Sequence, residues 1–456
     1  SDIILIKTCI DDKYNNDKNK LNFMIKKLNI CIAGLGNVGA NVVSTIINNE
    51  EFISLKASLL FNIIGVSAKN KFKKRIFDIN SYTWFDDPLD LIKLKECDIL
   101  IELIGEEKGI SFDLVKKALE KGIHVITANK ALLAKNGSEL FLIAEKNNAL
   151  LLFEAAVAGG IPIIKTLKND IFLNNIKKIS GILNGTTNYI LTTMDDQNLN
   201  FNEALSIAQK KGYTTPSESE LDIGGLDSAH KLTLISTISF GSEINFSNNY
   251  IAGISDIKID DIKNVKKLGY KIKLISEVFL IDDQIFCNTG PKLVKITNPL
   301  ANVDGVLNAI KIETDQLQSL FLEGEGAGGK ATASSVISDL YEISNNANTL
   351  SLGYKANKLT SYKKLDIIDI DIPFYMRIMT KDSAGVLSKI TSSLKDSDIS
   401  IEKILQLPEN NNNKMPIPII IFTHNVRRDK IIKAIDKIEN QDFVLEKIIF
   451  IPVDKS

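Results

Sequence analysis

An acidic and a basic residue stand four positions apart in the segment LDIGGLDSAHKL (221–232). The apolar pattern from Leu226 onward predicts a helix, on which Asp227 and Lys231 lie at i and i+4 on one face. A carboxylate beside an ammonium can hold the lysine charged and aim it as a proton donor to a carbonyl oxygen that receives hydride. A salt bridge on the protein surface is the alternative interpretation.

A glycine-rich turn, GLGNVG (34–39), follows the apolar run 28–33 and precedes a helical pattern. In such a strand–turn–helix unit the first glycine allows a tight turn, the second lets the backbone approach a pyrophosphate, and the third permits close packing. The helix N-terminus supplies amide donors to the phosphates. The alternative is a glycine-rich turn without a ligand. The residues predicted to bind a dinucleotide here are Gly34, Gly36, Asn37, Val38 and Gly39.

The next β-type run, 62–66, leads to Ser67 and a basic loop. An NAD-specific site would place an acidic residue near the end of this strand, to accept a hydrogen bond from the ribose 2′-hydroxyl. No Asp or Glu occurs over 52–77, whereas Lys69 and Arg75 belong to a run of cations. These cations can neutralise a 2′-phosphate and favour NADP over NAD. NAD as cofactor, or a merely solvated basic face, is the alternative.

Strand and helix patterns then alternate, with a buried run over 98–105, an amphipathic helix over 112–121 and a strand over 124–127. Such alternation predicts an α/β protein with a Rossmann-type doubly wound parallel sheet, whose ligand lies at the carboxyl ends of the strands. Thr127 and Lys130 fall at one of these ends. Both side chains are therefore expected at the cofactor cleft.

Two further segments carry polar groups at strand ends. The segment EAAVAGGIP (154–162) enters a glycine-rich turn, whose carbonyls could coordinate a hard cation together with the Glu154 carboxylate. A close-packed turn without a metal is the alternative. The segment GILNGTTN (181–188) contains Asn184 and Thr186, which we expect to hydrogen-bond a small polar substrate.

Composition excludes several classes of function. The chain has 456 residues, of which 44% are hydrophobic, enough for two or three domains with cores of their own. Its net charge of −1 gives no reason to expect nucleic acid or a membrane surface as a partner, and no apolar run reaches the roughly 18 residues of a membrane span. The four cysteines form no CxxC pair, which predicts a reduced, cytoplasmic protein without a zinc site.

Six motifs follow one another along the chain: GLGNVG (34–39), TANKALL (127–133), EAAVAGGIP (154–162), GILNGTTNYI (181–190), GLDSAHKL (225–232) and GEGAGGKATASSVISDL (324–340). In this order they resemble homoserine dehydrogenase, and the resemblance covers about residues 25–455. The resemblance implies the reversible, NAD(P)H-dependent reduction of L-aspartate 4-semialdehyde to L-homoserine, on the pathway to threonine and methionine. Another amino-acid dehydrogenase on the same fold, or a non-catalytic NADP-binding regulator, is the competing interpretation.

The resemblance also implies roles for single residues. The family's proton-donating lysine matches Lys231, its partner carboxylate matches Asp227, and Lys130 matches a lysine near nicotinamide and substrate. Asp222 matches a further carboxylate near the substrate, and Gly212 and Gly328 are counted with the cofactor-binding residues. A monovalent cation, expected to be Na⁺, would be bound by Glu154 and by the carbonyls of Val157, Gly159 and Ile161.

One position departs from the family pattern. The family has a Glu two residues after a Gly-Tyr pair, contacting the substrate amino group, but Gly212-Tyr213 is followed by two threonines and a proline. Glu218 or Glu220 could substitute for it, and the sequence does not choose between them. The departure concerns substrate affinity or preference rather than the class of reaction.

The C-terminal segment shows a βαββαβ order and resembles an ACT domain, a small-molecule-sensing and dimerising module. The family's Asp-x-Pro-Gly turn carries Ala384 in place of proline. L-threonine is the implied effector, docking at the turn 382–385, and a purely oligomerising module is the alternative. Deletion from about residue 365 onward is expected to leave an active core.

The protein is expected to be a homodimer or homotetramer that acts on a small-molecule substrate. Its predicted parts are an N-terminal tail (1–24), a dinucleotide-binding domain (25–153, to which 324–345 returns), an α+β substrate-binding and dimerisation domain (154–323), a linker (346–370) and an ACT-like regulatory domain (371–456).

Overall fold

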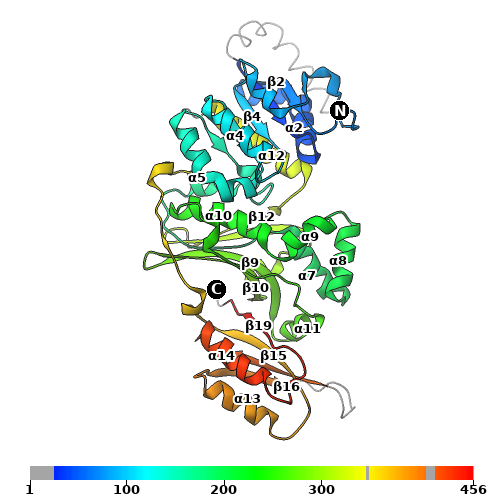
Figure 1. Cartoon of the computed structure of the whole chain (residues 1–456), viewed down its shortest axis with the longest axis vertical. Helices are drawn as coiled ribbons and strands as arrows, with labels where there is room; N and C mark the ends of the chain where they lie inside the picture. Colours follow the sequence, from blue (N-terminus) through cyan, green and yellow to red (C-terminus); the bar gives the residue numbers. More distant parts are fainter. Residues whose placement is uncertain (1–24, 346–348, 407–415, 455–456) are drawn as a thin grey trace, which may run out of the picture. The chain divides into compact units, whose positions relative to one another are not determined.

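The computed structural model describes residues 25–345, 349–406 and 416–454. The predicted N-terminal tail lies outside these residues. The chain divides into two compact units, Ser1–Gly160 with Ala327–Asn357, and Ile161–Gly326 with Lys358–Ser456. Figure 1 shows the elements of both units along the sequence. Within the described residues, no helix has both the length and the apolar character needed to cross a membrane.

The first unit is built on a six-stranded sheet in which every strand pair is parallel. The strand order, β3-β2-β1-β4-β5-β6, is that of the Rossmann fold, so the predicted doubly wound parallel sheet is confirmed. The strands are apolar runs because both faces of a parallel sheet are covered by helices. They are β1 (Lys26–Ala33), β2 (Leu59–Ser67), β3 (Trp84–Phe85), β4 (Ile99–Glu102), β5 (His124–Thr127) and β6 (Leu151–Leu152).

The helices of this unit connect successive strands, with one exception. That exception is α12, which follows Ile161–Gly326 of the second unit in sequence and packs on α2. Both helices contribute to one apolar core with the sheet of the first unit. Val42 and Ile46 of α2 meet Val336 and Leu340 of α12 in that core. The helices are α2 (Asn37–Asn48), α3 (Glu50–Ala57), α4 (Ile110–Glu120), α5 (Lys130–Lys146) and α12 (Gly329–Asn345).

The second unit contains a mixed seven-stranded sheet. Its path is β12-β11-β7-β9-β10-β13, and β8 pairs with β10 off that path. The central neighbours are antiparallel, while β8 and β13 run parallel to β10. The strands are β7 (Ile176–Ile182), β8 (Asn249–Ile251), β9 (Tyr270–Ile281), β10 (Gln284–Lys295), β11 (Leu307–Thr314), β12 (Ser319–Glu325) and β13 (Lys363–Lys364).

Among the helices of the second unit, α7 and α10 begin within segments that the sequence analysis singled out, 181–188 and 221–232. α7 begins directly after β7, and α10 begins after the Gly224-Gly225 pair. The buried face of α10 is nearly continuous, so its polar residues are held in a packed environment. These helices are α7 (Gly185–Gln197), α8 (Phe201–Lys210), α9 (Pro216–Ile223), α10 (Leu226–Phe240) and α11 (Ile259–Lys267).

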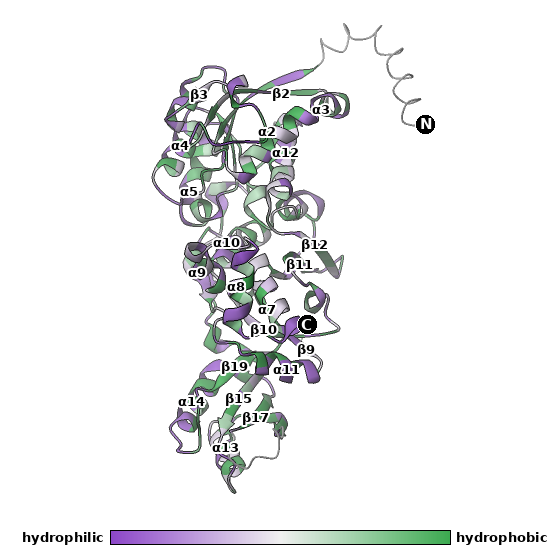
Figure 2. Ribbon diagram, turned by 90° about the vertical axis from the view of Figure 1, so that its right-hand side faces the viewer, coloured by the Kyte–Doolittle hydropathy of each residue, from purple (hydrophilic) through white to green (hydrophobic). Residues whose placement is uncertain are grey.

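The C-terminal part of the second unit has the predicted βαββαβ order. Its antiparallel sheet has the order β16-β17-β15-β19, the arrangement of a ferredoxin-like module. In Figure 2 its two helices alternate between hydrophilic and hydrophobic colours, as expected for helices that cover one face of a sheet. The elements are β15 (Phe374–Thr380), α13 (Val386–Lys395), β16 (Ile401–Gln406), β17 (Ile417–Thr423), α14 (Arg428–Glu439) and β19 (Ile449–Pro452).

The C-terminal module shares a core with the rest of its unit. Tyr375, Phe422 and Ile451 belong to the same apolar cluster as residues of α7 and α11. An ion pair crosses the same junction: Nε of Arg377 lies 2.6 Å from Oδ1 of Asp261 on α11, and both side chains are almost fully buried. The module is therefore packed onto the seven-stranded sheet and its helices.

The segment predicted as a linker is also ordered by specific contacts. In the first unit, Ser351 accepts a hydrogen bond from the main chain of Leu151 at 3.0 Å. In the second unit, β13 adds a short parallel strand to β10. The described part of 346–370 thus takes part in the packing of the units that it connects.

Candidate active site

The glycine turn at 34–39 has the geometry expected of a phosphate-binding loop. Gly34 has a positive φ of 101°, and a side chain there would collide with the Leu103 carbonyl. A side chain at Gly39 would collide with the Gly34 carbonyl, which explains the close packing of strand and helix. At Gly36 no described atom lies within 4 Å of the added carbon. The second glycine therefore leaves open space where a pyrophosphate could approach.

The N-terminus of α2 is free to receive an anion from the side of that open space. No described side chain caps the helix, and no acidic residue lies in its first turn. Unpaired amides at a helix N-terminus favour phosphate. The start of α12 lies beside it, because a side chain at Gly329 would come within 2.6 Å of Oδ1 of Asn37. Gly328, with a φ of 114°, forms the turn that brings α12 to this position.

The cations of the basic loop after β2 have different partners. Ser67 ends the strand, and its carbonyl accepts a hydrogen bond from Gly34 at 2.8 Å. Lys69 is exposed and forms an ion pair of 3.2 Å with Glu106. Arg75 instead donates to three carbonyls of its own loop, those of Asn70, Lys71 and Lys73. Lys69 is thus exposed, with a single partner on the surface, whereas the Arg75 guanidinium holds the loop together.

A buried carboxylate that the sequence analysis did not identify organises the carboxyl ends of the strands. Glu102 is fully buried at the end of β4 and accepts hydrogen bonds from the main chain of Ile104 at 2.8 Å and from Oγ1 of Thr127 at 2.6 Å. Thr127 in turn accepts from the main chain of Asn129, which caps α5. Lys130 is the first residue of that helix. The acidic residue inside the apolar run 98–105 was the available signal.

In the second unit, Asp227 and Lys231 form the predicted pair. Nζ of Lys231 lies 2.8 Å from Oδ2 of Asp227 and donates to the Leu183 carbonyl at 2.6 Å. Lys231 is 7% exposed, so the pair is buried rather than a surface salt bridge. Two fixed acceptors hold the ammonium in one direction.

A second carboxylate joins this pair through an amide. Nδ2 of Asn184 donates to Oδ1 of Asp222 at 2.7 Å and to Oδ2 of Asp227 at 3.0 Å. Burial and the nearby Asp227 charge raise the pKa of Asp222, against the hydrogen bonds from Asn184 and Thr214. Asp222, Asp227 and Lys231 carry a formal charge of −1 together when both carboxyls are ionised. Such an excess of negative charge suits a ligand that brings an ammonium group.

Of the residues that follow Gly212, Thr214 bonds to this cluster, whereas Glu218 bonds to Thr215. Oγ1 of Thr214 is buried and donates to Oδ2 of Asp222 at 2.9 Å. Oγ1 of Thr186 donates to the Tyr213 carbonyl at 3.1 Å. Glu218 lies on the exposed face of α9 and accepts from Oγ1 of Thr215 at 2.9 Å. Thr214 therefore contacts the site directly, and the sequence analysis did not identify it.

The turn after Glu154 is tightly packed within the first unit. Glu154 is 1% exposed, and its main chain donates to Oδ2 of Asp339 on α12 at 3.0 Å. The Gly159 carbonyl accepts from Oγ of Ser335 at 2.6 Å, and Val157 is extended and buried. Ile161 begins the second unit. A carbonyl oxygen can accept two interactions, so these contacts leave capacity for a cation.

The comparisons with known proteins agree on one family. A family model described as homoserine dehydrogenase matches residues 162–341, and one described as the NAD-binding domain of homoserine dehydrogenase matches residues 34–154. A homoserine dehydrogenase of Neisseria gonorrhoeae is 36% identical, over 94% of this chain and 99% of its own length.

The chain belongs to the homoserine dehydrogenase family. A homoserine dehydrogenase of Helicobacter pylori is also 36% identical, over 93% of this chain and 98% of its own length. The crystal structure of a homoserine dehydrogenase from Thiobacillus denitrificans is 33% identical with a TM-score of 0.86, covering 94% of this chain and 98% of that one. The protein is thus an oxidoreductase with a nicotinamide-binding domain, and the family resemblance read from the six motifs is confirmed.

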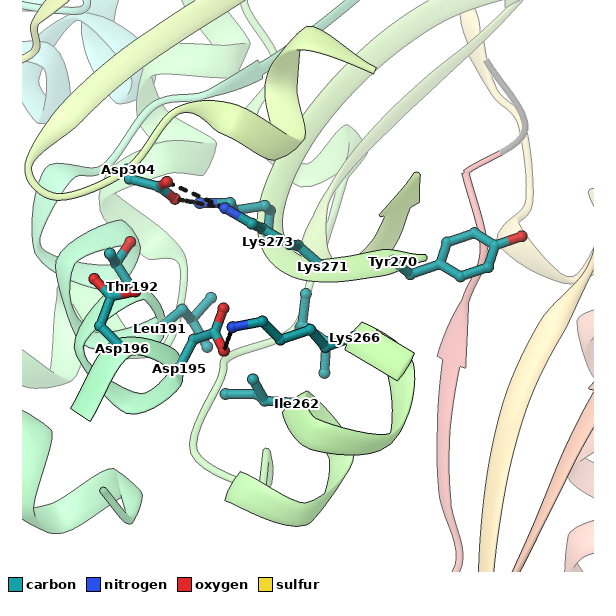
Figure 3. A pocket seen from close by; sticks show the side chains of 11 residues that line it. Leu191, Thr192, Asp195, Asp196, Ile262, Lys266, Tyr270, Lys271, Lys273 and Asp304 are labelled. Atoms are coloured by element: carbon teal, nitrogen blue, oxygen red, sulfur yellow. Dashed lines mark hydrogen bonds and ion pairs between the residues drawn. The ribbon is translucent and has the colours of Figure 1, made fainter. Parts of the chain in front are cut away.

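A second cluster of charges lies beside α7 and includes neither Asp227 nor Lys231. Figure 3 shows Lys271 and Lys273 directed at Asp304, and Lys266 directed at Asp195. Nζ of Lys273 also bonds to Oδ1 of Asn188 at 3.0 Å, in the first turns of α7. The hollow between these side chains measures about 20 Å³ and has room for little more than a water molecule. We interpret the cluster as an anchor for the helix that begins beside Asn184.

Proposed function

We propose that, in the reversible reduction of L-aspartate 4-semialdehyde to L-homoserine, Lys231 delivers the proton to the aldehyde oxygen. The observation that carries this role is the Lys231 ammonium held between Asp227 and the Leu183 carbonyl in a buried site. A reduced nicotinamide, when bound, supplies the hydride to the carbonyl carbon. In the oxidation of homoserine, the same lysine takes up the hydroxyl proton, with Asp227 keeping it in position.

We propose that the substrate ammonium is bound by the carboxylates of Asp222 and Asp227. Support comes from the net negative charge of the cluster and from Asn184, which holds both carboxylates through one amide. Thr214 orients Asp222, and Thr186 fixes the loop at Tyr213. In this proposal Asp222 and Thr214 take over the task of the missing glutamate. Glu218 is exposed and accepts a hydrogen bond from Thr215, so we propose Asp222 rather than Glu218 as the ligand of the ammonium.

The preferred cofactor in this proposal is NADP, with the phosphates at Gly34, Gly36, Asn37, Val38 and Gly39. Lys69 is the cation best suited to a 2′-phosphate, because Arg75 is already bonded to its own loop. Thr127, Lys130, Gly212 and Gly328 belong to the same proposed set of cofactor-binding residues. A hyperthermophilic archaeal homoserine dehydrogenase mutant, 27% identical with a TM-score of 0.58, was crystallised in complex with NADPH.

Further features of the family belong to the same proposal. A Na⁺ ion would be held by Glu154 with the carbonyls of Val157, Gly159 and Ile161, through oxygen ligands that suit a hard cation. The C-terminal module would act as an ACT domain, binding L-threonine near the turn 382–385, in a homodimer or homotetramer.

The free, buried thiols of Cys31, Cys97 and Cys287 support a reducing, cytoplasmic location.

Steady-state assays of the full chain test the substrate and the cofactor together. L-homoserine is offered with NADP or with NAD, and the reduced nicotinamide is followed by its absorbance. We expect turnover with L-homoserine, a lower KM for NADP than for NAD, and none with L-aspartate. Equal use of both nucleotides would contradict the role of Lys69. Turnover with L-aspartate in place of L-homoserine would contradict the proposed substrate.

A further inference from the structure

A cavity of about 310 Å³ lies within the second unit, away from Lys231 and its partners. One wall is a face of the β9–β10 ladder, where Phe286 and Asn288 lie opposite Phe279 and Glu277. The other wall is formed by the segment 370–373 and by the C-terminal module. Its size is at the lower end of the range for small-molecule sites.

The charges on the sheet wall satisfy one another. Glu277 is almost fully buried; it forms a short ion pair with Lys292 and lies 3.1 Å from Nζ of Lys178. Burial opposes ionisation of Glu277, but the two lysines outweigh it and lower its pKa to about 2. Lys178 also lies 3.8 Å from Asp454. This part of the wall is neutral overall and has no strong requirement for a further ion.

The opposite wall contributes a cation without a counterion. Arg428, the first residue of α14, is half-buried and lines the cavity. None of the residues that the structure describes forms an ion pair or a hydrogen bond with its guanidinium, which lies 5.1 Å from the centre of the Phe450 ring. Burial alone lowers its pKa. Its exposed neighbour Arg427, in contrast, is paired with Asp369 and Asp429.

A partly desolvated guanidinium is stabilised by contact with an anion, and its planar fork matches a carboxylate. The rest of the lining is largely apolar, with Phe279, Phe286, Ile372 and Val453. Asp371 also lines the cavity but forms no ion pair with Arg428. The occupant should therefore combine one negative group with a small apolar body. A larger anion such as a nucleotide would exceed the volume.

We propose that this cavity binds a small organic carboxylate, whose carboxylate pairs with Arg428 while its apolar part packs against Phe279 and Phe286. Asn288, on the same face of β10, offers an amide to a further polar group of the ligand. The ligand would contact both the C-terminal module and the sheet of the second unit. This inference does not depend on the proposed catalytic roles.

Calorimetric titration of the full chain with sodium isovalerate, at constant ionic strength, tests the proposal. The neutral isostere isovaleramide and the variants Arg428→Gln and Arg427→Gln are measured in parallel. We expect saturable binding of isovalerate, at least about tenfold weaker binding to Arg428→Gln, and unchanged binding to Arg427→Gln, because a hydrogen bond to a charged group is lost only in the first. Isovaleramide should not bind.

Two results would overturn the proposal. One is the absence of saturable isovalerate binding to the unaltered chain. The other is equal binding of isovalerate and isovaleramide, or of isovalerate to the chain with and without Arg428. If Arg428→Gln does not fold, Arg428→Lys keeps the charge but loses the bidentate geometry, and the comparison of acid with amide on the unaltered chain still decides the matter.

Discussion

At the scale of single residues, the site depends on where two carboxylates and one ammonium sit relative to Asn184. The amide holds Asp222 and Asp227 together, and burial, together with the neighbouring Asp227 charge, raises the pKa of Asp222. The Lys231 ammonium, paired with Asp227, partly offsets this effect. In the function proposed here, the site combines a positioned proton donor with a net negative charge for the substrate's amino group.

The raised pKa of Asp222 predicts an acid limb in the pH profile of substrate binding. A carboxyl with a raised pKa becomes protonated at a higher pH on acidification, and the protonated form no longer attracts an ammonium. We expect kcat/KM for L-aspartate 4-semialdehyde, whose reduction uses the protonated Lys231, to fall as pH decreases, beginning above the ordinary Asp pKa of about 3.9. Asp222→Asn should raise KM and remove this limb.

Glu218→Gln is the matched control for that experiment, since its side chain is exposed on α9 and bonded to Thr215. It should leave both KM and the acid limb nearly unchanged. An Asp222→Asn profile that keeps the acid limb of the unaltered enzyme would contradict the assignment of the limb to Asp222.

At the scale of elements, two turns position the chemistry. The glycine turn aims the first amides of α2, and the paired glycines before α10 bring Asp227 and Lys231 to the start of a buried helix. The two glycines at 36 and 39 have different tasks, because one faces open space and the other lies against the Gly34 carbonyl. A substitution at Gly36 should therefore weaken cofactor binding, whereas one at Gly39 should lower the stability of the fold.

Gly36→Ala should fold normally but bind NADP at least about tenfold more weakly, because the methyl group occupies the space of a phosphate. Gly39→Ala should lose about 1–3 kcal/mol of the free energy of unfolding, since the added carbon collides with main chain that cannot move away. Thermal denaturation and NADPH titration of both variants separate these effects. Equal loss of stability in the two would refute the division of tasks.

The elements that could be predicted from the sequence are those fixed by local patterns. The apolar runs of β1, β4 and β5 predict a parallel sheet, and the i, i+4 spacing of Asp227 and Lys231 predicts their contact. The acidic Glu102 inside an apolar run was a signal, but its partner Thr127 could not be predicted because it follows a different strand. The bonds of Arg75 could not be predicted because they depend on the irregular path of its own loop. The parallel pairing of β13 with β10 is likewise non-local. The helix predicted over 112–121 begins two residues earlier, at Ile110.

At the scale of the molecule, the C-terminal module is less separable than its sequence suggests. Tyr375, Phe422 and Ile451 share a core with α7 and α11, so removing the chain from about residue 365 would expose that core. We therefore expect such a deletion to yield an unstable protein rather than the active core predicted from the sequence. Regulation through this module would act through packed contacts with the substrate-side helices.

The contribution of the module's attachment to stability can be measured at the buried Arg377–Asp261 pair, which joins the C-terminal module to α11. Arg377→Met leaves the Asp261 carboxylate buried without its partner, and we expect a loss of about 3–5 kcal/mol in the free energy of unfolding. Lys258→Met, which breaks the exposed pair with Glu446, should cost less than about 1 kcal/mol. Chemical denaturation compares the two, and an equal, small effect of both changes would refute the anchoring role.

The role of Lys231 is tested most directly by the turnover of Lys231→Ala, measured together with its affinity for NADPH. Loss of a positioned general acid should lower kcat by about 10²–10⁴-fold while the Kd of NADPH stays within about twofold. Lys430→Ala, which removes a lysine of α14 that pairs with the exposed Asp398, should keep the activity of the unaltered enzyme. Near-normal turnover of Lys231→Ala would contradict the assignment of this lysine as the proton donor.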